Sequence, residues 1–178
     1  VQRRFSQVGR GQVGSLGTGM SVLSIDPGLW KTGCALWSGD GQLLRAWTQR
    51  QGKSQKKGPA LWRRMALSIC EETPSVLAIE IMQVDKRSKG KERDLFSLSG
   101  VIGAVVMRFP DAKIVAYTPA QWKGSVPKHV MQARLEKRLT PEELKAICAK
   151  STHDTWDAVG IGAKYWADQG HARWKPQR

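Results

Sequence analysis

Two short aliphatic runs in this chain each end on an acidic residue. Residues 22–25 read Val-Leu-Ser-Ile and precede Asp26, and residues 76–79 read Val-Leu-Ala-Ile and precede Glu80. A continuous apolar run such as 76–79 is typical of a strand that is covered on both faces of a sheet. The turn pair Pro27 and Gly28 closes the first run. The chain is therefore expected to carry a carboxylate at the end of each of two strands.

Hydrophobic periodicity and turn residues predict the remaining elements in the order β-β-β-α-β-α-β-α. The expected strands are 21–26, 33–38, 42–48, 76–79 and 113–117, and the expected helices are 59–72, 95–109, 127–138 and about 153–168. The helix at 95–109 is apolar nearly all round, which predicts that it lies buried against the sheet. Thr140 and Pro141 indicate a further helix start. The fold class is therefore α/β, with a mixed central sheet flanked by helices.

The length of 178 residues is typical of one domain of moderate size. Residues 1–19 contain five glycines and three arginines and no acid. We interpret them as a flexible basic arm, either native or a tag. The folded domain is expected at 20–170, and 171–178 are expected to form a basic C-terminal tail.

The strongest bias in composition is charge: 29 Lys and Arg against 15 Asp and Glu give a net charge of +14. Such a charge favours a polyanionic partner, nucleic acid first and an anionic membrane surface second. The longest apolar stretch, 95–107, is shorter than the roughly 20 residues of a membrane span. No secretory signal is evident, and three dispersed cysteines indicate reduced thiols, so a cytoplasmic location is expected.

Four carboxylates stand where a fold of this order would bring them together. Asp26 and Glu80 end strands, while Asp154 and Asp157 are three residues apart and so share one face of the last helix. A divalent cation would offset the desolvation of such carboxylates, and Mg²⁺ prefers hard oxygen ligands. Two ions about 3.5–4 Å apart could activate water and stabilise the leaving oxygen of a phosphodiester.

Each of these residues also has a simpler interpretation. Asp26 could initiate a turn, Glu80 could face solvent, and Asp154 could be an acid in the first turn behind a capping Ser or Thr. His153 could act as a general acid or position water, and a surface histidine next to a helix cap is an equally good account. The hypothesis of one metal site is favoured because it accounts for all four acids together.

Four segments of the chain resemble RuvC-type Holliday junction resolvases, of the RNase H-like superfamily. VLSIDPGL at 22–29, followed by Thr32 and Gly33, resembles the opening motif, and AIE at 78–80 resembles the second acidic motif. HDTWDAVG at 153–160 is similar to the closing motif, and YTPAQWK at 117–123 is similar to the segment with a basic residue near the scissile phosphate. The resemblance spans roughly 21–166.

The resemblance implies a Mg²⁺- or Mn²⁺-dependent endonuclease that nicks branched DNA as a homodimer. Asp26, Glu80, Asp154 and Asp157 match the acidic positions, and Lys123 matches the basic one. The chain departs from cellular resolvases at 82–93, where a charged loop follows the second acid, and at 122–128, which looks more like the phage-encoded branch. Forks, flaps and Y-junctions are therefore expected substrates beside the four-way junction.

Basic side chains gather in three parts of the sequence, which predicts contacts with DNA phosphates. The clusters are Arg50, Lys53, Lys56 and Lys57; Lys86, Arg87, Lys89, Lys91 and Arg93; and Lys123, Lys128, Arg134, Lys137 and Arg138. Solvated surface charge is the simpler reading of any one run. Trp30, beside Asp26, could stack on an unpaired base at a branch point.

Three other functions compete with branched-DNA cleavage. The same acids could serve a nuclease that acts on RNA–DNA hybrid or structured RNA, because the recognition loops differ while the site is shared. An ATPase of the sugar-kinase and actin type would need a second domain, and this chain is too short and too basic for one. A non-catalytic junction-binding module is disfavoured because an acidic cluster without metal repels DNA.

Overall fold

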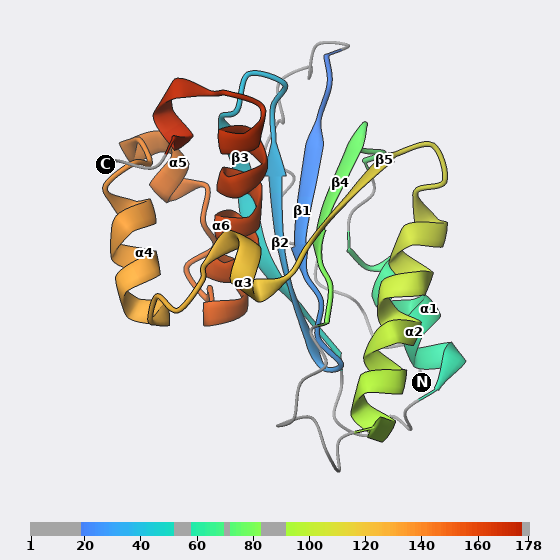
Figure 1. Ribbon diagram of the computed structural model, residues 1–178. Helices are drawn as coiled ribbons and strands as arrows, with labels where there is room; N and C mark the ends of the chain where they lie inside the picture. The colour runs from blue at the N-terminus through green and yellow to red at the C-terminus, as the bar shows by residue number, and fades with distance from the viewer. Residues whose placement is uncertain (1–18, 52–57, 70–71, 83–91, 176–178) are drawn as a thin grey trace, which may run out of the picture.

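A five-stranded mixed sheet forms the centre of the molecule in a computed structural model that describes residues 19–51, 58–69, 72–82 and 92–175 (Figure 1). The strands are β1 Val22–Asp26, β2 Lys31–Trp37, β3 Leu43–Arg50, β4 Val76–Glu80 and β5 Lys113–Tyr117. Their order is β3-β2-β1-β4-β5, with β1, β4 and β5 parallel and β2 antiparallel to both β1 and β3. The predicted α/β fold with a mixed sheet is confirmed.

Helices cover both faces of this sheet (Figure 1). They are α1 Pro59–Leu67, α2 Glu92–Arg108, α3 Pro119–Trp122, α4 Lys128–Glu136, α5 Pro141–Lys145 and α6 His153–Asp168, followed by the 3-10 turn η2 Ala172–Trp174. α1 and α2 lie on one face, and α6 lies on the other with α4 packed outside it (Figure 1). The predicted bounds of 153–168 for the last helix match α6.

Alternation along β1 divides its side chains between two cores. Leu23 and Ile25 belong to the core under α1 and α2, whereas Val22 belongs to the core under α6. Ser24 also faces α6, because its Oγ donates a hydrogen bond of 2.8 Å to the carbonyl oxygen of Ala158. Because side chains alternate with period two, Asp26 continues the α6 face. The strand pattern therefore decides which side of the sheet the carboxylate occupies.

Two glycines let the backbone of α6 approach the sheet closely. A Cβ at Gly33 of β2 would collide with the backbone carbonyl of Asp154, and one at Gly162 of α6 would collide with the indole of Trp37. The Trp37 indole is fully buried and donates a 2.9 Å hydrogen bond to Ser24. The first turn of α6 is thus held directly against β2, beside the end of β1.

The helix predicted at 95–109 packs against the sheet as predicted, but it is buried on one side only. Val101 and Val105 of α2 are fully buried, but Phe96 is 70% and Met107 is 78% exposed. α2 packs against α1 and the sheet, and no described element covers its outer face. α1 also ends earlier than predicted, at Leu67 rather than at 72.

The C-terminal part of the described chain packs onto the domain. Thr140 caps α5 as predicted, since its Oγ1 accepts a hydrogen bond from the backbone N–H of Glu143. Arg173, in the segment expected to be a tail, forms a 2.8 Å ion pair with Glu143, and Trp174 is buried. Residues 1–18 of the arm predicted at 1–19, and residues 176–178, lie outside the described residues.

Two further expectations concern thiols and membranes. Cys34 is buried, Cys148 is an exposed free thiol, and Cys70 lies outside the described residues. Among the helices described, none has the length and apolar character needed to cross a bilayer.

Candidate active site

The carboxylates of the two acidic strand ends come from neighbouring parallel strands. Ile25 of β1 pairs with Ile79 of β4, so Asp26 and Glu80 follow at the same level of the sheet. Parallel strands end at a common edge, and both residues occupy the face that α6 covers. The sheet register therefore brings together two acids that are far apart in the sequence.

The N-terminal turns of α6 add the other two acids. Thr152 caps this helix, and its Oγ1 donates a 3.1 Å hydrogen bond to Oδ2 of Asp154. The Oγ1 of Thr48 on β3 lies 2.8 Å from that of Thr152 and 2.6 Å from that of Thr155. This hydroxyl cluster ties the helix start to the sheet. Asp157, three residues after Asp154, is buried.

The electrostatics of Asp26 show that the four acids lie close together. Burial raises the pKa of Asp26 well above its ordinary value, and the negative charges of Glu80, Asp157 and Asp154 raise it further. The positive charge of Lys123 acts in the opposite direction. A buried carboxyl group surrounded by three others favours the protonated form unless a cation is near. The site therefore has the charge distribution that attracts a cation.

Two lysines supply positive charge on one side of the cluster. Nζ of Lys128 lies 3.1 Å and Nζ of Lys123 lies 3.5 Å from Oδ2 of Asp157. Partial burial of Lys128 disfavours its charged form, but the carboxylates of Asp157, Asp26 and Asp154 outweigh this effect and raise its pKa. Lys128 is thus held as an ammonium ion beside the acids, and Lys123 lies next to the same carboxylate.

Glu80 is held by an indole that the sequence did not single out. The Nε1 of Trp122 donates a 2.6 Å hydrogen bond to Oε2 of Glu80. Burial raises the pKa of Glu80, while this hydrogen bond and the charge of Lys123 partly counter the increase. A signal was present, because a buried tryptophan needs a partner for its N–H and Trp122 directly precedes Lys123.

Similarity to solved structures then identifies the fold. A Thermus thermophilus RuvC structure in complex with a Holliday junction substrate superposes with a TM-score of 0.60 at 17% identity, covering 85% of this chain and 98% of that chain. The chain has the RuvC fold. A second T. thermophilus RuvC structure gives a TM-score of 0.59 at 17% identity, with the same coverage of both chains.

A more distant neighbour of this RuvC fold is the yeast mitochondrial Holliday junction resolvase Ydc2. It has a TM-score of 0.50 at 10% identity, covering 90% of this chain and 82% of that chain. No protein-family model matches the chain, and no curated protein matches it in sequence. The comparisons therefore establish the fold, and the chemistry is argued from the residues.

On this RuvC fold, the structure gathers most of the predicted site residues and leaves one of them exposed at the start of α6. Asp26, Glu80, Asp157 and Lys123 interact as described above. His153 begins α6 and is exposed to solvent. Lys128, predicted from the sequence only as a phosphate contact, instead approaches Asp157 directly.

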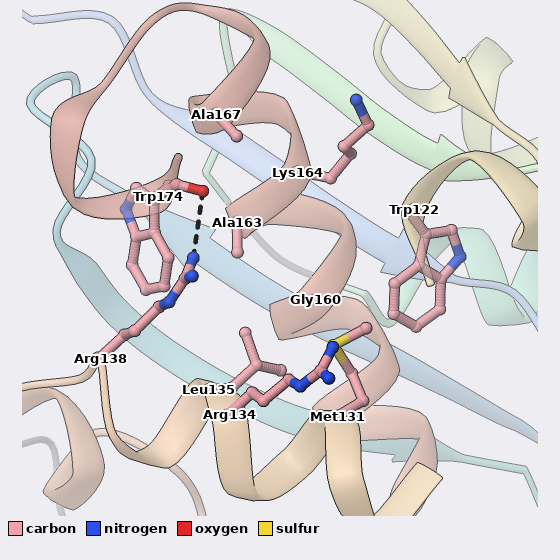
Figure 2. A pocket seen from close by; sticks show the side chains of 10 residues that line it. All are labelled: Trp122, Met131, Arg134, Leu135, Arg138, Gly160, Ala163, Lys164, Ala167 and Trp174. Atoms are coloured by element: carbon pink, nitrogen blue, oxygen red, sulfur yellow. Dashed lines mark hydrogen bonds between the residues drawn. The ribbon is translucent and has the colours of Figure 1, made fainter. Parts of the chain in front are cut away.

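The predicted DNA contacts divide into described and undescribed positions. Lys53, Lys56, Lys57, Lys86, Arg87, Lys89 and Lys91 lie outside the described residues. Arg134 is exposed on α4, on the rim of a cavity of about 180 Å³ between α4 and α6 (Figure 2). Trp122 lies at one end of this cavity and Trp174 at the other (Figure 2). Trp30 is half-buried near the end of β1.

The donor set of this RuvC-fold site suits a hard divalent cation. Its members offer carboxylate oxygens, the ligands that Mg²⁺ and Mn²⁺ prefer. The described residues contain no cluster of three or more side chains already converged on one metal position. Oδ2 of Asp157 is paired with two lysines, so this side chain must be released from them before that oxygen can bind a cation. The residues fit a metal by chemistry and burial.

Proposed function

We propose that this protein is a metal-dependent endonuclease that cuts branched DNA. The observation that carries the proposal is the gathering of buried and half-buried acids from β1, β4 and α6, next to the side-chain nitrogens of two lysines. Acids that bind cations and lysines that bind phosphates are both needed where a phosphodiester is hydrolysed. The RuvC fold and the net charge of +14 support a nucleic-acid substrate.

Asp26, Glu80, Asp154 and Asp157 would hold the cation, Mg²⁺ or Mn²⁺, with two ions in each site. When bound, such ions supply an activated water and stabilise the leaving oxygen. Burial and the charges of the other three acids raise the pKa of Asp26, and bound cations would offset both effects. Lys123 and Lys128 lie where they can pair with a phosphate oxygen after releasing Asp157.

The proposed substrate class includes Holliday junctions and related forks and flaps. The RuvC neighbour of the same fold was solved with a Holliday junction substrate, which supports this choice of substrate. The resemblance of 122–128 to phage-encoded resolvases favours the broader set of branches. Phosphate contacts from α4 would give affinity without base sequence preference.

A homodimer would place two such sites on symmetric strands, and the exposed face of α2 supports it. Phe96 and Met107 are eleven residues apart, close to three helical turns, so both lie on the same outer face of α2. A second copy could cover this face by a two-fold contact. Analytical ultracentrifugation should show a dimer for the wild type and a monomer for Phe96→Glu.

Cleavage of an end-labelled panel tests the proposed activity. The panel contains a four-way junction, a Y-fork, plain duplex and an RNA–DNA hybrid, each with Mg²⁺, Mn²⁺ or EDTA. We expect paired nicks in the branched substrates with either metal and none with EDTA. Asp26→Asn should abolish cleavage and leave junction binding intact or stronger, because one repelling charge is removed.

Other outcomes identify the competing functions. Cleavage confined to the RNA–DNA hybrid would replace the branched-DNA substrate with a hybrid. Junction binding without cleavage in any metal would support the non-catalytic binding module. Full turnover by Asp26→Asn would overturn the assignment of the acidic cluster.

A further inference from the structure

Trp122 occupies the junction between the acidic cluster and the helical layer outside the sheet. It ends the short helix α3, which follows β5 directly and begins behind the cap residue Thr118. Its side chain is only 8% exposed. The indole nitrogen points away from the other side chains that line the cavity between α4 and α6 (Figure 2). That nitrogen donates the 2.6 Å hydrogen bond to Oε2 of Glu80.

The indole is held in this position by contacts on more than one side. Gly160 of α6 leaves the space that the ring fills, since a Cβ there would lie 2.5 Å from Cζ3 of Trp122. The ammonium of Lys123 lies 4.6 Å from the ring centroid, within the range of a cation–π contact. The ring also belongs to the core under α6. Its N–H therefore has a fixed direction.

The hydrogen bond from Trp122 to Oε2 restricts the conformation of the Glu80 side chain. The side chain of a glutamate has several rotatable bonds, and Glu80 stands at the end of a strand beside three other acids. The hydrogen bond holds one carboxylate oxygen and leaves Oε1 available. It also stabilises the charged form of a half-buried carboxylate in an environment of like charge.

We infer that Trp122 is a positioning residue, which orients Glu80 for binding a divalent cation. The inference rests on the proposed function, because the cation is the one that the acidic cluster would hold. Partners of this kind, which orient a ligand without touching the metal, typically contribute about 10–100-fold to metal affinity or activity. Trp122 acts through Glu80, and Gly160 acts by making room for Trp122.

Binding of Mn²⁺ alone, followed by electron paramagnetic resonance, tests this role without any nuclease activity. Trp122→Phe keeps an aromatic ring and removes the N–H, so its affinity for Mn²⁺ should fall about tenfold. Gly160→Ala keeps the N–H but displaces the ring, and it should weaken Mn²⁺ binding in the same direction. Junction affinity in EDTA should be unchanged for both variants, since neither residue carries charge.

Trp62→Phe is the matched control. Trp62 is partly buried on the opposite face of the sheet, packs against Gly100, and its Nε1 has no hydrogen-bond partner among the described residues. This variant should bind Mn²⁺ like the wild type. If Trp122→Phe does not fold, 3-benzothienylalanine introduced at position 122 removes only the N–H and retains the shape of the ring.

The outcomes separate this inference from the proposed function. Wild-type affinity for Mn²⁺ in the Trp122 variants, even with a lowered melting temperature, would show a merely structural role and overturn the inference. Weakened Mn²⁺ binding together with a wild type that cuts no nucleic acid would support the positioning role and overturn the nuclease. A wild type that binds no Mn²⁺ would overturn both.

Discussion

Asp26 carries a charge that the metal-free fold accommodates poorly. Burial and three neighbouring acids raise its pKa, so between its ordinary value of 3.8 and the raised value the folded protein binds more protons than the unfolded chain. The free energy of unfolding therefore falls as the pH rises through that window, and the full destabilisation by the Asp26 charge is present above it. A residue that opposes folding in this way is typical of a functional site.

Replacing this charge should stabilise the protein. We expect Asp26→Asn to raise the melting temperature at neutral pH in EDTA by a few degrees, and the gain should disappear below about pH 4, where both forms are neutral. Thermal melts from pH 3.5 to 8 measure the effect. Asp40→Asn is the control of opposite sign, because a hydrogen bond from Ser38 lowers the pKa of Asp40. A gain that is independent of pH would contradict the electrostatic cause.

Glu143 is a second acidic residue whose charge affects the stability of the fold. It is 1% exposed, forms an ion pair with Arg173, and accepts hydrogen bonds from the backbone N–H groups of Leu43 and Thr140. One side chain therefore joins β3, α5 and the C-terminal turn. Removing the Glu143 carboxylate takes away the acceptor that Arg173 and the two backbone N–H groups share, and leaving buried donors unpaired destabilises the fold.

Glu143→Ala should lower the free energy of unfolding by about 3–5 kcal/mol, as is usual when one partner of a buried pair is removed. Lys164→Ala breaks the more exposed ion pair with Asp168 and should cost at most about 1 kcal/mol. Urea denaturation of both variants measures the difference. Equal losses in the two variants would show that burial does not govern these pairs.

At the scale of elements, the approach of α6 to β2 sets the position of two acids. The first turn of α6 lies against Gly33, where the backbone carbonyl of Asp154 leaves no room for a Cβ. The hydroxyl cluster of Thr48, Thr152 and Thr155 holds the same turn from β3. Any added atom at Gly33 must therefore move the helix start and the carboxylates on it.

Gly33→Ala should reduce single-turnover cleavage of a junction by about 100-fold, because a displacement of about 1 Å can cost that much in an active site. Thr140→Ala is the matched control. It removes the cap of α5, away from the acids, and should cost about 1 kcal/mol of stability while cleavage is retained. Full activity of Gly33→Ala would show that the helix start adapts without moving the acids.

At the scale of the whole molecule, the net charge of +14 dominates the interaction with DNA. A protein that neutralises several phosphates releases counterions, so its affinity falls linearly with salt on a double logarithmic plot. Lys128 and Arg134 on α4 lie on the same side of the sheet as the acidic cluster, which places basic residues beside the site.

The affinity for a four-way junction should fall by about 10³-fold or more between 50 and 200 mM salt if six or more phosphates are contacted. Fluorescence anisotropy with a labelled junction in EDTA measures this slope. Arg134→Gln should lower the slope by about 1 and weaken binding equally on all sequences. An unchanged slope would remove Arg134 from the interface.

Structural features that depend on residues close together in the sequence could be predicted. The apolar runs before Asp26 and Glu80 predicted the strands that carry them, and the cap at Thr140 and the bounds 153–168 followed from helix signals. The predicted order of strands and helices then implied that the acids meet. Each of these depends on side-chain period and on backbone groups a few residues apart.

Contacts between distant residues were decided by the tertiary structure alone. Trp122 and Glu80 are 42 residues apart in the sequence, and Arg173 and Glu143 are 30 residues apart. No local sequence pattern predicts a contact over such a separation. Likewise the apolar content of α2 did not reveal that Phe96 would remain exposed. The sequence by itself determined the elements and the acids, because periodicity and capping are local. Only the packing of the elements could decide which donor faces which carboxylate.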